Sequence, residues 1–172
     1  MNNYDVSIVP CADYEQAESA LVKVLEPIGG LDWVQQGMKV AVKVNLVTAM
    51  KPDTAGTTHP ALVCALTKLL KERGAEVIIG DSPGGIYSSV YLNRVYSVTG
   101  MRDAVEYGAK LNDNFSQTEV SFPEAKVLKS FTCTSWLLEA DAIIDFCKLK
   151  SHGMMGMSGA VKNMFGKIHG TM

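Results

Sequence analysis

The chain has 172 residues, of which 47% are apolar, and a formal net charge of −2. This length and apolar content suffice for one hydrophobic core, and the slightly acidic balance argues against nonspecific nucleic-acid binding, which needs a broadly basic face. No apolar stretch is long enough to span a bilayer, and the N-terminus MNNYDVSIVP lacks the regions of a signal peptide. We therefore expect a soluble cytoplasmic domain without a nucleic-acid or membrane partner.

The first half of the chain alternates strand-like and helix-like segments. Asp13 begins the first helix-like segment as an N-cap, and Thr58-His59-Pro60 opens the second, which Gly74 ends. The apolar runs predict three strands, over residues 6–9, 38–45 and 75–80. The strand at 38–45 is apolar at nearly every position, which is typical of a buried parallel strand.

The second half continues the alternation with shorter segments. Periodicity is weak over 86–108, where we expect pieces of helix, and residues 116–122 and 126–131 read as short strands. A brief helix at 136–139, a strand at 141–146 and a helix from Ser158 complete the predicted elements. The order predicts a single domain over 1–172, a doubly wound α/β fold with a mostly parallel sheet and helices on both faces. It is Rossmann-like, although the dinucleotide fingerprint GxGxxG is absent.

Polar residues follow three of the expected strands. Ligands of such sheets bind beyond the carboxyl ends of the strands, so these residues are expected to meet at one edge. The candidates for catalysis there are His152, Asp81 and Lys150. Asp81 lies in a turn-like DSPGG segment, and its alternative reading is a turn cap or a partner for a lysine.

The last 27 residues contain four lysines and two histidines but no Asp or Glu. A strand there leads into a glycine-spaced loop and then into a helix, whose N-terminal N–H groups favour negative charge. We therefore expect a bound carboxylate or phosphate, and the alternative is a solvated basic turn. The candidates for anion binding are Lys43, Asn45, Lys148, Gly156, Gly159, Lys162 and Asn163.

No recognisable cofactor or metal motif is present. The four cysteines are scattered without a CxxC pair and are expected to be free thiols, and the Walker A spacing fails around Lys162. If a metal binds, the candidate ligands are His59, Asp81 and His152, although His59 has an equally good explanation as a helix cap.

Several motifs together resemble one prokaryotic family. They are VKVNLV at 42–47, His59-Pro60, GDSPGG at 80–85 and KLKSHGMMGMSGAVKNMFG at 148–166, and they resemble the family called domain of unknown function 362. The resemblance implies a longer parent protein, because many relatives carry a ferredoxin-type module with [4Fe-4S] clusters, and this chain has no cysteine motif for one. The lysine-bearing glycine loop also has a fainter similarity to the catalytic domain of nickel-pincer lactate racemases.

These observations leave two hypotheses for function. The first is the substrate domain of a redox or proton-transfer enzyme, of oxidoreductase or racemase/isomerase type, which binds a small anion and works with an iron–sulfur module. The second is a noncatalytic anion- or cofactor-binding module. In either case we expect the apolar face of the terminal helix to contact a second copy in a homodimer or a missing C-terminal segment.

Overall fold

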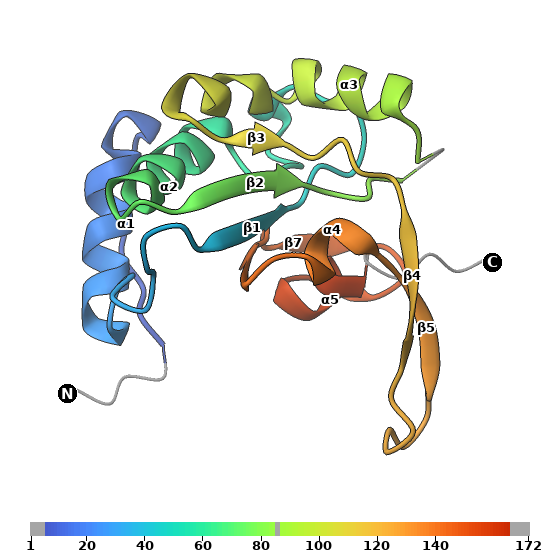
Figure 1. Ribbon diagram of the computed structural model, residues 1–172. Helices are drawn as coiled ribbons and strands as arrows, with labels where there is room; N and C mark the ends of the chain where they lie inside the picture. Colours follow the sequence, from blue (N-terminus) through green and yellow to red (C-terminus); the bar gives the residue numbers. More distant parts are fainter. Residues whose placement is uncertain (1–5, 85–86, 166–172) are drawn as a thin grey trace.

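A four-stranded parallel sheet lies at the centre of the molecule, in the order β3-β2-β1-β6 (Figure 1). The computed structural model describes residues 6–84 and 87–165. The strands of the sheet are β1 (Lys39–Val44), β2 (Glu76–Gly80), β3 (Lys110–Leu111) and β6 (Ala142–Phe146). Helices flank the sheet, so the chain has the Rossmann-like α/β architecture that the alternating sequence pattern predicts.

One face of the sheet carries the main hydrophobic core. Val40, Val42 and Val44 of β1 are fully buried with Val77 and Ile79 of β2. Their cover consists of α1 (Ala17–Leu25), α2 (Pro60–Glu72), α3 (Ser89–Val98) and the 3₁₀ segment η4 (Met101–Tyr107). Shorter 3₁₀ segments are η1 (Tyr14–Gln16), η2 (Glu26–Ile28) and η3 (Pro52–Thr54).

The opposite face has a thinner cover, made of the two short helices α4 (Ser135–Leu138) and α5 (Ala160–Phe165). Successive side chains of a strand point to opposite faces, so Ala41 and Lys43 turn away from the main core. Ala41 packs with Trp136 and Leu137 of α4. Gly80 leaves room for this packing, because a Cβ there would lie 2.7 Å from Trp136. The polar site develops on this thinly covered face.

Two small antiparallel sheets complete the described part of the fold. Strands β4 (Gln117–Ser121) and β5 (Ser130–Thr134) form an arm that projects from the body (Figure 1). Strands β7 (Lys150–His152) and β8 (Gly156–Ser158) form a hairpin directly before α5. This hairpin replaces the open glycine loop that the sequence predicts, since Gly156 supplies the positive φ of 74° at the end of its turn.

Two further expectations about elements need correction. Residues 6–9 form no strand, and Val6 and Ile8 are exposed. The strand expected over 126–131 forms later, over Ser130–Thr134, because the intervening residues make the turn of the arm. Of the quoted motifs, Gly85 and Gly166 lie outside the described residues.

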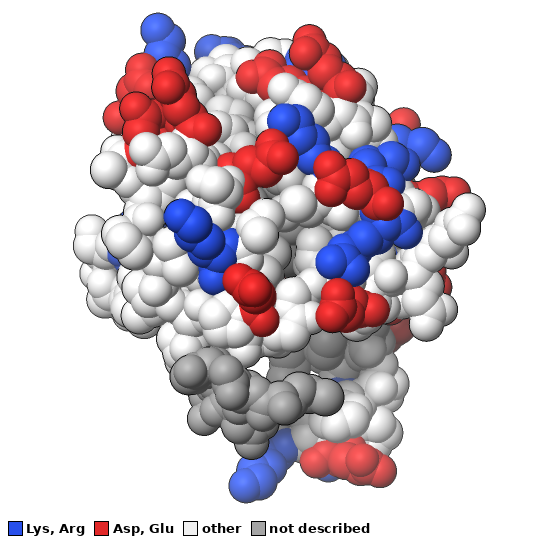
Figure 2. All heavy atoms as spheres, turned by 90° about the vertical axis from the view of Figure 1, so that its left-hand side faces the viewer, with Lys and Arg blue, Asp and Glu red and all other residues white. Residues whose placement is uncertain are grey.

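The described part of the chain contains no helix long and apolar enough to cross a membrane. On the face that carries α1, basic and acidic side chains are interspersed (Figure 2). Two exposed ion pairs occur in this region: Lys68 of α2 with Glu18 of α1, and Arg73, directly after α2, with Asp32 in the segment before β1.

Candidate functional site

A cavity of about 270 Å³ opens where β1 and β2 end and the β7–β8 hairpin approaches them. It collects residues from four separate stretches of the chain, which the parallel sheet brings to one edge. The lining consists of Lys43, Asn45, Val47, Asp81, Ser82, Pro83, Gly84, Lys150, His152, Ser158, Lys162 and Asn163.

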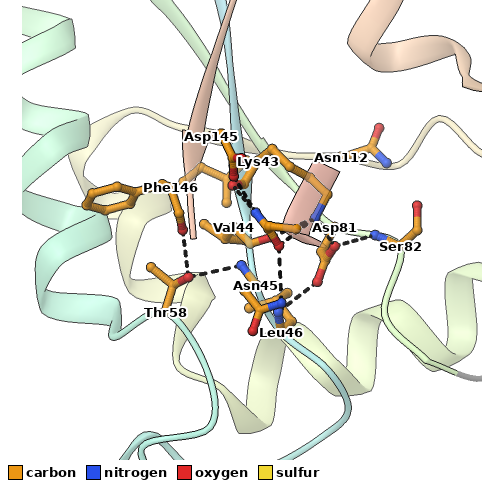
Figure 3. Close-up of polar contacts among 12 residues, drawn as sticks. Lys43, Val44, Asn45, Leu46, Thr58, Asp81, Ser82, Asn112, Asp145 and Phe146 are labelled. Carbon is orange, nitrogen blue, oxygen red and sulfur yellow. Dashed lines mark hydrogen bonds and ion pairs between the residues drawn. The ribbon is translucent and has the colours of Figure 1, made fainter. Parts of the chain in front are cut away.

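A buried ion pair lies at the base of this cavity. Lys43 and Asp81 are 1% and 3% exposed, and the ammonium group of Lys43 contacts Oδ1 of Asp81 (Figure 3). Asp81 Oδ1 also accepts a hydrogen bond from the Ser82 N–H (2.8 Å), and Oδ2 accepts one from the Leu46 N–H (2.7 Å). Asp81 therefore ties the loops after β1 and β2 to each other, with both oxygens engaged.

Asn163 joins α5 to the same network. Its Oδ1 accepts hydrogen bonds from Lys43 Nζ (3.2 Å) and Asn45 Nδ2 (3.1 Å). Its Nδ2 donates to the Lys43 carbonyl (3.2 Å) and to Asp145 Oδ1 (2.6 Å). One buried amide thus fixes the position of α5 over β1 and β6.

Lys150 approaches the cavity from the hairpin. Its Nζ donates to Asn45 Oδ1 at 2.6 Å and to the carbonyl of Gly56. Burial lowers the pKa of Lys150, with Lys148 and Lys162 adding to this effect and Asp81 opposing it. Lys162 lies on α5, with its Nζ 5.3 Å from the centre of the Phe165 ring.

The loop after β1 has an unusual backbone at Val47, a β-branched residue with a φ of 56°. The Thr48 N–H donates to the Leu46 carbonyl at 2.5 Å, so Val47 occupies the centre of a γ-turn, a rare and strained conformation. The Gly84 N–H donates to the Val47 carbonyl at 2.8 Å and holds the turn against the loop after β2. This strain lies directly in the cavity wall.

The structure therefore brings most of the sequence-predicted residues together. All three catalytic candidates, His152, Asp81 and Lys150, line the cavity. The anion-binding candidates Lys43, Asn45, Lys162 and Asn163 line it as well, but Lys148, Gly156 and Gly159 are not part of the lining. Their roles in binding or catalysis stay predictions.

The three metal candidates do not converge. His59 lies in a different cavity with Tyr14 and Cys64, where its ring stacks on Tyr14 and its Nδ1 accepts from the Ala61 N–H as the cap of α2. Burial, and secondarily Lys148, lowers the pKa of His59. Within residues 6–84 and 87–165, no group of three His, Cys, Asp or Glu side chains could hold a metal ion. The cysteines described are free thiols.

Five residues of the cavity lining were not among the predicted site residues: Val47, Ser82, Pro83, Gly84 and Ser158. Ser82 belongs to the recognised GDSPGG motif, so its position after β2 was a usable signal. Ser158 is buried at the end of β8, and no local pattern distinguishes it from a surface serine. β-branched residues such as Val47 rarely adopt a positive φ, so the sequence does not predict this conformation.

Comparison with known proteins gives one family and one relative. The profile of the family described as domain of unknown function (DUF362) matches residues 40–172. The chain is 30% identical over 171 residues to the thylakoid-associated protein sll1697 of Synechocystis sp. (strain ATCC 27184 / PCC 6803 / Kazusa). That alignment covers 97% of this chain and 51% of the relative, so the chain spans about half the length of that protein. No solved structure matches the chain. The match over residues 40–172 includes every described residue that lines the cavity. Because it covers most of the chain, the chain belongs to the DUF362 family.

Proposed function

We propose that this domain binds a small carboxylate- or phosphate-bearing molecule in the cavity at the carboxyl edge of the sheet. The charge of the lining carries the proposal. Among the described residues that line the cavity there are three lysines, Lys43, Lys150 and Lys162, and one carboxylate, that of Asp81. Asp81 is paired with Lys43, so the lining retains an excess of two positive charges that an anion would balance.

The size and shape of the cavity support a small ligand. Its volume of about 270 Å³ lies just below the usual range for ligand pockets, about 300–1,000 Å³. The base is rigid, because Asp81 and Asn163 each make several hydrogen bonds to neighbouring segments. A rigid, positively charged base lowers the entropic cost of ordering side chains around a ligand.

The test is calorimetric titration with sulfate, phosphate and a dicarboxylate at low ionic strength. The variant Lys162→Met keeps side-chain length and removes the charge, and we expect it to weaken binding by about tenfold, the effect of losing one charge-assisted contact. Lys126→Met is the matched control, because Lys126 is exposed in the turn of the distant arm. Equal affinities in Lys162→Met and the control would contradict the proposal, as would wild-type protein that binds none of the three anions.

We further propose that the complete protein is a redox or proton-transfer enzyme of which this domain holds the substrate. Support comes from His152, Asp81 and Lys150 in one cavity, where Asp81 holds the two loops of the wall in place and the side chains of His152 and Lys150 can contact a reacting group. A [4Fe-4S] module elsewhere in the longer protein would supply electrons. Native mass spectrometry of the full-length protein, purified without oxygen, tests this proposal through the mass of any retained cluster. If the full-length protein retains no cluster, and binds anions but catalyses no reaction, the alternative hypothesis of a noncatalytic binding module is favoured.

Two proposals about partners and location complete this picture. Exposed apolar side chains near α5, including Met157, Val161 and Phe165, support contact with a second copy or with a further segment of a longer protein. Light scattering of this domain and of the full-length protein distinguishes the two.

We retain the cytoplasm as the proposed location. Because the relative is named thylakoid-associated, fractionation of cells into soluble and membrane samples is the direct test.

A further inference from the structure

The position of His152 defines which of its ring nitrogens can meet a ligand. His152 ends β7, lines the cavity and precedes the tight turn of the hairpin. Its Nδ1 lies 3.2 Å from the backbone nitrogen of Met154 and 3.2 Å from that of Met155, and it accepts a hydrogen bond from each N–H. The hairpin turn therefore occupies Nδ1 as an acceptor.

A neutral imidazole carries one proton, so one ring nitrogen donates a hydrogen bond and the other accepts. Two N–H groups directed at Nδ1 require the lone pair there, which places the proton on Nε2. Protonating Nδ1 would also remove both hydrogen bonds of the turn. The ring is consequently poorly suited to take a proton from a substrate through either nitrogen.

We propose that His152 presents its Nε2–H to the cavity as a hydrogen-bond donor to an oxygen of the bound anion, and acts neither as a general base nor as a metal ligand through Nε2. The inference rests on the proposed anion site and adds a specific role to it. His152 joins the ammonium groups of Lys150 and Lys162 as a donor in the lining. Such a set of donors recognises a carboxylate or phosphate oxygen and would stabilise negative charge that develops there.

Nuclear magnetic resonance of the ligand-free, ¹⁵N-labelled protein tests the tautomer directly. Long-range ¹H–¹⁵N correlation distinguishes a protonated from an unprotonated ring nitrogen, and His152→Gln identifies the signals. We expect neutral His152 to carry its proton on Nε2, and the correlations to remain unchanged on addition of Zn²⁺ or Ni²⁺. A proton on Nδ1, or a metal-induced shift of Nε2, would overturn the inference. This measurement decides the tautomer even if the anion proposal fails.

Two substitutions then test the role in binding, with sulfate as the probe. His152→Gln places an amide N–H near the position of Nε2, whereas His152→Leu removes the donor. We expect the Gln variant to stay within about threefold of wild-type affinity and the Leu variant to lose about tenfold. His59→Leu is the control, since it removes an imidazole outside the cavity. Equal losses in the Gln and Leu variants would overturn the donor role. Failure of wild-type protein to bind sulfate, phosphate or a dicarboxylate would instead overturn the anion site.

Discussion

The buried pair of Lys43 and Asp81 is the residue-level feature on which the cavity depends. Each charged group is almost fully buried, so hydrogen bonds to both groups must compensate for their loss of contact with water. Asp81 has three donors and Lys43 has three acceptors, namely Val44 O, Asn163 Oδ1 and Asp81 itself. This arrangement favours a positioning role for Asp81, which links the two loops that form the cavity wall.

We predict that removing either partner of this pair is strongly destabilising. Lys43→Met and Asp81→Asn should each lower the free energy of unfolding by about 3–5 kcal/mol, because the remaining buried group loses its main partner. The double variant should lose less unfolding free energy than the two single variants lose together, because it leaves neither charge buried without its partner. Urea denaturation measures all three values. Strict additivity would show that the two side chains do not interact in solution.

The γ-turn at Val47 makes a second prediction. Substitution by Ala or Gly removes both γ-methyl groups of the valine, but only Gly, which lacks a Cβ, accepts a positive φ without steric conflict. Val47→Gly should therefore be more stable than Val47→Ala by about 1 kcal/mol. Ala and Gly can also be compared at position 41, in the strand β1. There the wild-type protein with Ala41 should be more stable than Ala41→Gly. Thermal unfolding of the variants provides the comparison, and a less stable Gly variant at position 47 would argue against the strained turn.

The pKa of Lys150 makes a third prediction, which concerns pH. Burial lowers this pKa, so the ammonium group loses its proton at a lower pH than the ordinary lysine value of about 10.4. Sulfate keeps its charge over this range, and its affinity should therefore fall as the pH rises through the pKa of Lys150. In Lys150→Arg the guanidinium stays charged, so the fall should move to higher pH. Calorimetry across alkaline pH tests this, and identical profiles would remove Lys150 from the binding site.

At the scale of elements, the packing of β2 against α4 depends on a glycine. A Cβ at Gly80 would lie 2.7 Å from the Trp136 ring and 2.9 Å from the Asn112 Cβ. We predict that Gly80→Ala lowers stability by about 1–3 kcal/mol through overpacking. Gly153→Ala is the matched control, because a Cβ there would meet no atom within 4 Å. Chemical denaturation compares the two, and equal stabilities would show that α4 can move away from the sheet without cost.

The hairpin β7–β8 is the element that most changes the interpretation of the site. A glycine-spaced loop would direct backbone N–H groups at an anion, whereas the hairpin uses its N–H groups to pair its strands and to hold His152. The side chains of Lys150 and Lys162 therefore carry the attraction for an anion in this structure. The short helix α5 contributes Lys162 and the amide of Asn163.

For the whole molecule, we predict an uneven distribution of local stability. Strand β1 lies between β2 and β6, and its residues from Val40 to Val44 are almost inaccessible to solvent. The arm of β4 and β5 is a two-stranded ribbon, a structure that is marginally stable without further packing. Amide hydrogen exchange should be slowest in β1 and much faster in the arm, particularly in β4, whose side chains are mostly exposed. Comparable protection of both regions would indicate that the arm is covered in solution, for example by a second copy.

The sequence by itself determined the α/β class and the edge at which the cavity lies. Buried parallel strands and amphipathic helices leave local patterns, and residues that follow such strands must meet at their carboxyl ends, so Lys43, Asp81 and Lys150 could be grouped without coordinates. Tertiary structure alone decided how these groups are used. The contacts of Lys43 with Asp81 and with Asn163 join residues 38 and 120 positions apart, which no local pattern encodes. The glycine spacing of the terminal motif was compatible with both a loop and a hairpin. Pairing of Lys150 with Ser158 selected the hairpin, which turned Nδ1 of His152 toward the backbone.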